Sequence, residues 1–402
     1  MPDVTSDVLP DILVVNAGSS SLKVKLLPAN LSLTIERIGG EASLSSSLDA
    51  PPSPAMSDIH NHTDAFHYAL AVLNHNQPNS TADIRGVGHR VVHGGEQYKA
   101  STRIDDAVLT GIAELSPLAP LHNPANLEGI RAAQTVLPEA VHVAVFDTAF
   151  HATLPPASYL YGLPRRFYEE QGIRRYGFHG TSHDYVTRRA ADYLAKTFDK
   201  RPDDLKLVSL HLGNGASAAA VKGGQSVDTT MGLTPLAGLL MGTRVGDIDP
   251  SVLLQLMRDG LTVDELDKLL NKVSGLLGLS GVSNDMRDVK QAADTGNTAA
   301  SEAFEVFCYR VTKTIGAYAA AMQGLDAVIF TAGIGEHDAD VRAGVVKGLE
   351  FLGIHLDTSK NTSPTFDENG VSDISQAASP VRILVIRTDE EAMIASETAK
   401  FL

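Results

Sequence analysis

Short apolar runs alternate with longer amphipathic segments along most of the chain. Five runs rich in Val, Ile and Leu are bounded by polar residues or glycine, at residues 12–16, 141–147, 205–213, 327–333 and 381–386. Such runs are typical of strands that are covered on both faces. Helical spacing of apolar residues marks further stretches at residues 126–137, 183–198, 251–260, 302–322 and 338–353. The alternation predicts an α/β fold.

One segment, residues 43–62, departs from this alternation. Ser, Pro, Asp and His dominate it, and it carries no sustained apolar run. This composition predicts an exposed loop between the elements on either side of it.

The first apolar run is followed by small polar residues that can bury almost nothing. The sequence LVVNAGSSSLKVKL, which starts at residue 13, resembles VSLHLGNGASAAAV, which starts 195 residues later. The alignment pairs Asn16 with His211, Gly18 with Gly213 and Lys23 with Ala218. Two unrelated glycine hairpins could share this pattern by chance. Alternatively, the chain has two similar halves, each with a Gly-turned hairpin whose N–H groups and hydroxyls approach a phosphate chain in a shared cleft.

Composition narrows the classes of function. The 402 residues are 43% hydrophobic, which is enough to fill the cores of two or three domains. The net charge of -15 disfavours a nucleic-acid or anionic-membrane surface, so an anionic ligand must be held by a local site. The single cysteine, Cys308, lies in a helical stretch, which favours a buried thiol over a reactive one. No signal sequence and no apolar run of about 18 residues is present, which predicts a cytoplasmic protein.

Familiar nucleotide motifs do not explain the glycine turns. Neither hairpin matches the P-loop pattern, and no GxGxxG follows a strand with an acidic residue about 20 positions later. A third small-residue turn, TAGIGEH at residues 331–337, follows an apolar run. Its Gly333 and Gly335 would leave room for a base or ribose, although an ordinary strand-to-helix turn explains the same sequence.

Charged residues gather at the predicted strand ends, where α/β proteins bind ligands. In GHRVVHGGEQY, Arg90 either forms a structural ion pair or binds a carboxylate or phosphate. Its flanking histidines lack the Glu of HExxH, so a zinc site is disfavoured. Other strand-end or loop candidates are Asp147, His179, Arg244, Glu390 and Glu391. Each alone is more typical of a capped turn or solvated loop, but together they supply the cations and carboxylates of phosphoryl transfer.

Eight segments together resemble the acetate kinases in order and spacing, over nearly the whole chain. They are VVNAGSSSLK, GHRVVHGG, FDTAFH, RRYGFHGTSH, HLGNGAS, MGTRVGDIDP, TAGIGEH and RTDEEAMIA. The resemblance implies a duplicated ribonuclease H-like, actin-like ATPase fold with two domains and an interdomain cleft. It places residues 1–150 and about 386–402 in an acetate and phosphoryl domain, and residues 151–385 in a nucleotide-binding domain.

The family resemblance also implies a chemistry. Members interconvert acetate plus ATP with acetyl phosphate plus ADP, require Mg²⁺, for which Mn²⁺ is a candidate substitute, and form homodimers. Because a carboxylate is already nucleophilic at neutral pH, the reaction needs positioning and charge neutralisation rather than a strong base. Direct in-line transfer is therefore favoured over a phosphorylated enzyme residue. No nucleic-acid or membrane partner is expected.

Residue roles follow from the matching motifs. The resemblance implies that Asn16 and Glu390 position the metal and that Ser19, Ser21 and Lys23 contact the phosphoryl group. It implies that Arg90 and Arg244 flank the acyl phosphate with positive charge. It further implies that Asp147 aligns the substrate and that His179 stabilises the transition state. The implied acetate pocket comprises Val92, Leu121, Phe178 and Pro235. The implied nucleotide contacts are His211, Leu212, Gly213, Asn214, Gly215, Asp285, Met286, Arg287, Gly333, Ile334, Gly335, Glu336 and His337. Spacing alone does not choose between Glu390 and Glu391, and we take the first.

Two residues depart from the family pattern. Val245 stands where a small residue is expected after the loop arginine, and Met286 stands where an aromatic residue is expected between Asp285 and Arg287. These changes bear on loop packing and on the fit of adenine, and neither removes a charged group.

Three alternatives differ from acetate phosphorylation. A propionate or butyrate kinase of the same family would need a larger pocket than Val92 leaves, although one methylene contributes only about 1–3 kcal/mol of discrimination. An ATP-driven chaperone or filament protein would not need Arg90, Asp147, His179 and Arg244 together. A metal-binding module on His60, His62 and His67 is disfavoured because the stretch lacks a firm fourth ligand.

Overall fold

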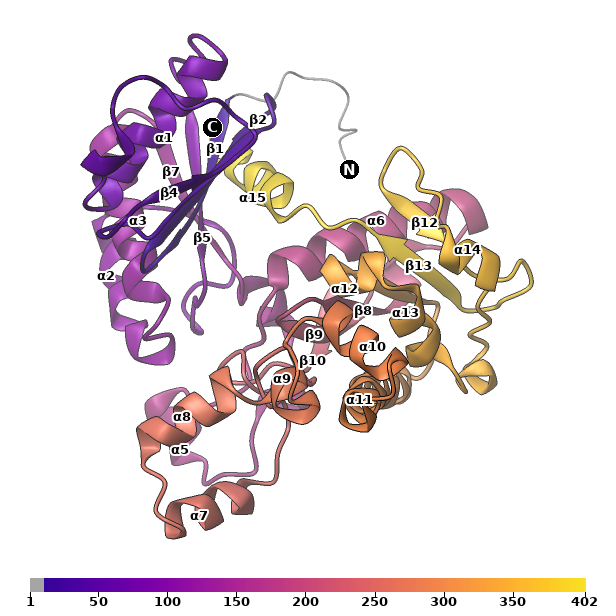
Figure 1. Ribbon diagram of the computed structural model, residues 1–402. Helices are drawn as coiled ribbons and strands as arrows, with labels where there is room; N and C mark the ends of the chain where they lie inside the picture. Colours follow the sequence, from indigo (N-terminus) through magenta and orange to yellow (C-terminus); the bar gives the residue numbers. More distant parts are fainter. Residues whose placement is uncertain (1–10) are drawn as a thin grey trace. The chain divides into compact units, whose positions relative to one another are not determined.

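The computed structural model describes residues 11–402, which form two compact units. Unit 1 contains the chain up to Ala149 together with Asp389–Leu402, and unit 2 contains Phe150–Thr388. The chain therefore passes from unit 1 to unit 2 once and returns for its last helix (Figure 1).

Unit 1 is built on one mixed sheet of seven strands, in the order β4-β3-β2-β1-β5-β7-β6. The strands are β1 (Ile12–Gly18), β2 (Ser21–Leu27), β3 (Leu31–Glu36), β4 (Ser43–Ser45), β5 (Gly86–Val91), β6 (Thr102–Arg103) and β7 (Val141–Phe146). The first four form an antiparallel meander, whereas β1, β5 and β7 run parallel. The carboxyl ends of these three parallel strands therefore meet at one edge of the sheet.

Helices cover both faces of the unit 1 sheet (Figure 1). They are α1 (His62–Asn76), α2 (Asp106–Glu114), α3 (Asn123–Val136) and α15 (Glu390–Ala399). Leu13 and Val15 of β1 pack in the core formed with α1 and α3, whereas Ile12 and Val14 pack against α15. This alternation is the period-2 pattern of a strand buried on both faces.

One glycine sets how closely α3 approaches the sheet. A Cβ added at Gly129 would lie 2.3 Å from the Cβ of Ala17. That separation is impossible for two carbon atoms, so the helix can pack this close to β1 only with glycine at the contact.

Unit 2 has a six-stranded sheet with the order β10-β9-β8-β11-β13-β12. Its strands are β8 (Lys206–Leu212), β9 (Ala216–Lys222), β10 (Gln225–Thr229), β11 (Ala327–Thr331), β12 (Val371–Asp373) and β13 (Arg382–Ile386). As in unit 1, an antiparallel meander leads into three parallel strands, here β8, β11 and β13.

The helices of unit 2 include two long ones that contact its sheet, α6 (Gly180–Phe198) and α11 (Thr298–Met322). The others are α4 (Pro156–Tyr159), α5 (Arg166–Gln171), α7 (Pro250–Arg258), α8 (Val263–Lys272), α9 (Gly275–Ser280), α10 (Met286–Asp294), α12 (Ala332–His337), α13 (Ala339–Val346) and α14 (Thr358–Thr362). Within residues 11–402, no helix combines the length and the apolar character needed to cross a membrane.

The two units share one strand plan, which confirms the predicted α/β class and the duplication. The order β3-β2-β1-β5-β7 in unit 1 corresponds to β10-β9-β8-β11-β13 in unit 2. The two hairpins differ by one residue in register: Asn16 pairs with Lys23, whereas His211 pairs with Ser217. The predicted match of Lys23 with Ala218 is therefore wrong by one residue, and Ser217 occupies the corresponding place.

The remaining predictions of local structure were mostly confirmed. The five apolar runs are strands, and Cys308 is buried in α11, where burial raises the pKa of its thiol to about 12. Residues 43–62 are largely loop, with β4 and one short 3₁₀ helix. The expected turn at residues 331–337 is instead the short helix α12. The expected helix at residues 338–353 ends at Val346, because Gly348 adopts a left-handed φ of 82° that α-helix does not allow.

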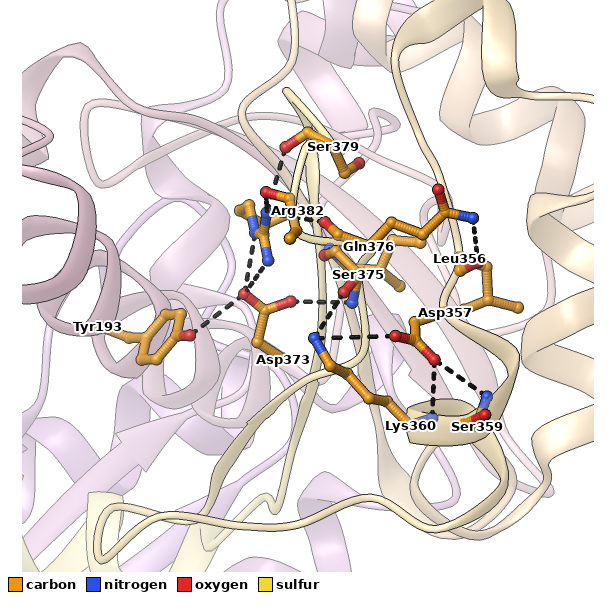
Figure 2. A network of polar contacts seen from close by, with 12 residues as sticks. Tyr193, Leu356, Asp357, Ser359, Lys360, Asp373, Ser375, Gln376, Ser379 and Arg382 are labelled. Carbon is orange, nitrogen blue, oxygen red and sulfur yellow. Dashed lines mark hydrogen bonds and ion pairs between the residues drawn. The ribbon is translucent and has the colours of Figure 1, made fainter.

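A polar network stabilises the β12–β13 edge of unit 2 (Figure 2). Arg382 donates to Asp373 through Nε at 2.9 Å and a terminal nitrogen at 2.6 Å, and Tyr193 donates to the same carboxylate at 3.1 Å. The other terminal nitrogen of Arg382 contacts the carbonyls of Gln376 and Ser379, both at 3.2 Å. Because every side-chain nitrogen of Arg382 has a protein acceptor, we interpret the network as structural.

Candidate active site

Unit 1 places Arg90 and Asp147 side by side at the carboxyl ends of two neighbouring parallel strands. Arg90 lies near the end of β5, and Asp147 directly follows β7. Nε of Arg90 is 3.1 Å from both carboxylate oxygens, and a terminal nitrogen is 2.7 Å from Oδ2. The side chain of Asp147 is 1% exposed, whereas that of Arg90 is 24% exposed. Only the arginine therefore offers appreciable surface to a ligand.

The pair is electrostatically coupled to the start of α15. The carboxylate of Asp147 raises the pKa of Arg90, with smaller contributions of the same sign from Glu390 and Glu391. Burial raises the pKa of Asp147, and the charge of Arg90 opposes that rise. The charge of Arg90 therefore favours the ionised form of Asp147.

The β1–β2 hairpin brings Asn16 and Lys23 to the same part of unit 1. The two residues are opposite each other in the hairpin register. The ammonium of Lys23 forms an ion pair with Glu391. Glu390 raises the pKa of both Arg90 and Asp147, whereas Glu391 contributes only to that of Arg90, and the choice of Glu390 as the metal residue stays a prediction.

A buried histidine contacts the turn of this hairpin. Nε2 of His62 lies 2.8 Å from the carbonyl oxygen of Gly18, and its Nδ1 lies 2.9 Å from Glu128. Ser19 is exposed and Ser21 is half-buried, so the turn that carries them offers hydroxyls at the surface. His62 thus orders the turn instead of joining His60 and His67 in a metal site, and residues 11–402 contain no group of three or more His, Cys, Asp or Glu suited to a metal.

Unit 2 places His179 at the start of α6 in an unusual backbone conformation. Its φ of 57° and ψ of 25° are left-handed, a region that non-glycine residues seldom adopt. Its Nδ1 lies 2.8 Å from the hydroxyl of Ser217, and its ring stacks on His211 with centroids 4.1 Å apart. These contacts compensate for the backbone strain and fix the ring.

Arg244 and His179 converge on the turn of the second hairpin. A Cβ added at Gly215 would lie 3.2 Å from a terminal nitrogen of Arg244 and 3.6 Å from Nε2 of His179. The other terminal nitrogen of Arg244 donates to the carbonyl of Pro235 at 2.6 Å. Burial lowers the pKa of Arg244, which marks a partly desolvated cation suited to an anion.

The hairpin turn itself is tied to the following loops. The backbone N–H of Gly242 donates to the carbonyl of Asn214 at 2.9 Å. The side-chain amide of Asn284 donates to Oδ1 of Asn214 at 3.0 Å. Within the turn, the N–H of Gly213 donates to the carbonyl of Gly215 at 3.1 Å. The predicted nucleotide-binding glycines therefore lie on a braced loop.

The start of α10 carries the predicted Asp285, Met286 and Arg287 group. Asp285 caps the helix by accepting from the N–H of Arg287 at 2.9 Å, and it also pairs with that residue's guanidinium, which lowers the pKa of Asp285 to about 2. Arg287 is exposed, whereas Met286 is 2% exposed. Met286 and the equally buried Leu212 therefore offer almost no surface to a ligand in this structure, and their nucleotide contacts stay a prediction.

Helix α12 presents the predicted Gly333–His337 segment. Gly333 and His337 are exposed, Ile334 is half-buried and Gly335 is buried. Oε1 of Glu336 accepts from the backbone N–H groups of Ala332 at 2.9 Å and Thr388 at 3.1 Å. Glu336 thus braces its own helix against the end of unit 2, a structural contact that the motif did not reveal.

The predicted acyl-pocket residues differ in their exposure. Val92 and Phe178 are buried at 7% and 2% exposed, and Pro235 is half-buried. Leu121 is 70% exposed, so within unit 1 it packs against little and its place in the pocket remains a prediction.

Sequence reasoning missed the polar residues behind His179. His183 lies within the quoted motif RRYGFHGTSH, four residues after His179, and this closeness in sequence was the available signal. Ser217 could be found only from the correct hairpin register, which the offset of 195 residues misplaces by one.

The donor set of unit 1 fits a hard divalent cation. Mg²⁺ usually takes one or two protein oxygen ligands and completes its octahedron with water and phosphate. The amide of Asn16 and the carboxylate of Glu390 are oxygen donors of this kind, whereas both oxygens of the nearby Asp147 already accept from Arg90.

Comparisons with known proteins match nearly the whole chain. Residues 11–396 match the sequence model of the acetokinase family. A protein of Staphylococcus aureus (strain JH9) named acetate kinase is 49% identical over 398 residues, which cover 97% of this chain and 98% of that protein.

Two solved structures resemble the whole chain. The crystal structure of Porphyromonas gingivalis acetate kinase matches with a TM-score of 0.88 at 41% identity and covers 97% of this chain and 99% of its own. The crystal structure of a propionate kinase from Francisella tularensis subsp. tularensis SCHU S4 matches with a TM-score of 0.85 at 39% identity. The match covers 97% of this chain and 99% of that chain.

Proposed function

The chain belongs to the acetokinase family, and we propose that it transfers the γ-phosphoryl group of ATP reversibly to acetate, giving acetyl phosphate and ADP. The observation that carries the proposal is the pair of cationic sites in two units with one strand plan: Arg90 with Asp147 in unit 1, and Arg244 with His179 in unit 2. Phosphoryl transfer depends on such fixed positive charge around the equatorial oxygens.

The acceptor needs little activation. A carboxylate is ionised at neutral pH and is already a nucleophile, so no residue has to remove a proton from it. Arg90 neutralises charge and is held rigidly by Asp147, while His179 and Arg244 donate to the phosphoryl oxygens. This division of labour supports direct in-line transfer without a phosphorylated residue.

Magnesium completes the charge balance. Asn16 and Glu390 would hold the ion, and when bound it would neutralise the phosphate oxygens of the nucleotide. Asp147 would align acetate through Arg90, whose guanidinium it holds in one orientation. Mn²⁺, which also accepts oxygen ligands in an octahedral shell, is the expected substitute.

The two units would divide the substrates between them. We assign the acetate and phosphoryl side to unit 1 and the nucleotide to unit 2, through the turn at His211–Gly215, the start of α10 and helix α12. Catalysis then requires groups from both units, so domain closure belongs to the mechanism. The homodimer implied by the family resemblance is part of the same proposal.

The size of the acyl pocket decides between acetate and its longer homologues. A propionate kinase of the family shares the fold, so propionate is the serious alternative, with butyrate behind it. Val92 is buried directly after β5 and its backbone N–H donates to Asn126 at 3.1 Å, which fixes the position of its side chain. One methylene contributes about 1–3 kcal/mol, so we expect acetate to be preferred and propionate to be turned over more slowly.

A substrate panel tests this function. ADP release would be followed by a coupled assay with Mg²⁺–ATP and acetate, propionate or butyrate, with a reaction lacking acid as the control. The proposal expects acid-dependent release with the highest kcat/KM for acetate. A higher kcat/KM for propionate would make the chain a propionate kinase, and acid-independent release would indicate an ATPase of another class.

A further inference from the structure

His179 is held by a line of buried side chains in unit 2. Its Nδ1 is 2.8 Å from Oγ of Ser217, which is 2.8 Å from Nε2 of His183. Nδ1 of His183 is in turn 2.8 Å from Oγ of Ser209. Ser217, His183 and Ser209 are each 0% exposed, so water does not compete for these hydrogen bonds.

Protons can be arranged along this line in only two ways. Burial lowers the pKa of His183 well below its ordinary value, so its imidazole is neutral and has one donor and one acceptor nitrogen. Ser217 has one hydroxyl proton, which goes either to His179 or to His183. The direction of the whole line therefore fixes which nitrogen of His179 carries a proton.

The ligand and its neighbours select one direction. Nε2 of His179 lies on the side of Gly215, near the guanidinium of Arg244. An anionic phosphoryl oxygen there requires a proton on Nε2, and the adjacent cation disfavours a second proton on the ring. Nδ1 must then accept from Ser217, Ser217 must accept from Nε2 of His183, and His183 must accept from Ser209.

We propose that Ser209, His183 and Ser217 form a directed hydrogen-bond chain that holds neutral His179 as the tautomer with its proton on Nε2. The three are positioning residues, since they act on the reaction only through His179. The left-handed backbone of His179 supports this role, because a strained residue keeps its place only when its neighbours determine it. The proposal rests on the proposed function only for the anionic oxygen that Nε2 meets.

The tautomer can be measured directly in the wild-type protein. Long-range ¹H–¹⁵N spectra of the ¹⁵N-histidine-labelled enzyme at pH 7 would show the protonation of both ring nitrogens, with the His179 signals assigned from their loss in His179→Gln. We expect a protonated Nε2 and an unprotonated Nδ1. A proton on Nδ1, alone or together with one on Nε2, overturns the proposal.

Ser217→Ala tests the effect on the reaction. We expect kcat to fall about tenfold, less than the loss of a whole oxyanion donor, with the KM values for ATP and acetate within about twofold of wild type. The spectra should show His179 as a mixture of tautomers. An unchanged kcat with a single unchanged tautomer contradicts the chain, and the wild-type spectrum decides the matter if this variant does not fold.

Ser375→Ala is the matched control. Ser375 is also 0% exposed in unit 2, and its hydroxyl accepts from the backbone N–H of Ile383 at 2.7 Å beside the β12–β13 edge. It should lose similar stability but keep the wild-type kcat and the wild-type His179 tautomer. An equal fall in kcat in both variants would make the role of Ser217 merely structural. A wild-type enzyme without acetate turnover would refute the proposed function. The measured tautomer of His179 would still show whether the hydrogen-bond chain has the proposed direction.

Discussion

The ion pair of Arg90 with Asp147 serves two purposes at once. The guanidinium keeps a carboxylate charged although its side chain is only 1% exposed, and the carboxylate holds the guanidinium in one orientation. A planar, preoriented donor of this kind loses little freedom when it meets a phosphoryl group. Arg244 is held differently, because one of its terminal nitrogens donates to the carbonyl of Pro235.

Removing either arginine should therefore lower catalysis, and removing Arg90 should also lower the stability of unit 1, because Asp147 would be left buried without its cation. Arg90→Ala and Arg244→Ala are each expected to lower kcat by about 10²-fold or more, because each removes fixed positive charge from the transition state. Arg165→Ala, which removes an exposed arginine paired with Glu169, is the control and should keep full turnover. Near-normal turnover in one active-site variant, with an unchanged circular dichroism spectrum, would exclude that arginine from the mechanism.

Val92 sets the prediction for substrate size. Val92→Ala removes two methyl groups from a buried side chain, and the space should admit the longer acyl chain of propionate. We expect the ratio of kcat/KM for propionate over acetate to rise by about 1 kcal/mol, or roughly fivefold. The ratio would be measured with both acids under identical conditions, and no change would place Val92 outside the pocket.

At the scale of elements, the chain was most predictable where one local rule decides the outcome. The five apolar runs became strands because both faces of each sheet are covered, and α11 formed where a long apolar period contains no proline and tolerates a single glycine, Gly316. The predictions of local structure were wrong where the chain turns and reverses its direction. The two hairpin turns differ by one residue, so an alignment without a gap missed Ser217, and Gly348 ended a helix that periodicity extended to residue 353.

Some residues of the candidate site could be found from motifs, and others could not. Arg90, Asp147 and His179 can be found from the sequence, because they are charged or ionisable residues in glycine-rich segments at predicted strand ends. His62, which holds the turn at Gly18, could not be found in this way. Its role depends on a contact between elements that are distant in sequence, and such a contact leaves no local sequence pattern.

The buried histidines of unit 2 make its stability depend on pH. Burial lowers the pKa of His151 from 6.5 to about 4, so between these values the unfolded chain binds a proton that the folded chain does not. The stability from keeping this ring neutral is complete above pH 6.5 and is lost as the pH falls toward 4. His183 contributes in the same direction, because burial also lowers its pKa.

The expected effect is measurable by urea unfolding. His151 alone should make the protein about 2 kcal/mol less stable at pH 5 than at pH 7. His151→Asn should reduce that difference, although the variant is less stable overall, whereas replacement of the exposed His75 by Gln should leave it unchanged. Equal stability of the wild type at the two pH values would show that His151 is not kept neutral by burial.

At the scale of the whole molecule, two similar sheets carry complementary halves of one proposed site. Neither unit contains Arg90 with Asp147 and Arg244 with His179 together, so neither should be active alone. Binding of ligands that contact both units should therefore favour a closed arrangement, whereas acetate alone touches too few groups to shift the population.

Small-angle scattering can follow this change. ADP, Mg²⁺ and acetate together with a planar phosphoryl mimic should reduce the radius of gyration, and acetate alone should leave it near the unliganded value. Arg165→Ala serves as the control, because its exposed side chain should not alter the response. Identical curves for the unliganded and mimic-bound enzyme would mean that the two units do not close on the ligands.

The central claim is that acetate itself accepts the phosphoryl group directly from ATP. Its most direct test is to incubate the enzyme with Mg²⁺ and ATP labelled with ³²P at the γ position, with and without acetate, and to separate acyl phosphate, inorganic phosphate and protein. The account predicts label in acetyl phosphate when acetate is present and no labelled protein when acetate is absent. Label that accumulates on the protein, or appears only as inorganic phosphate whether or not acetate is added, would contradict it.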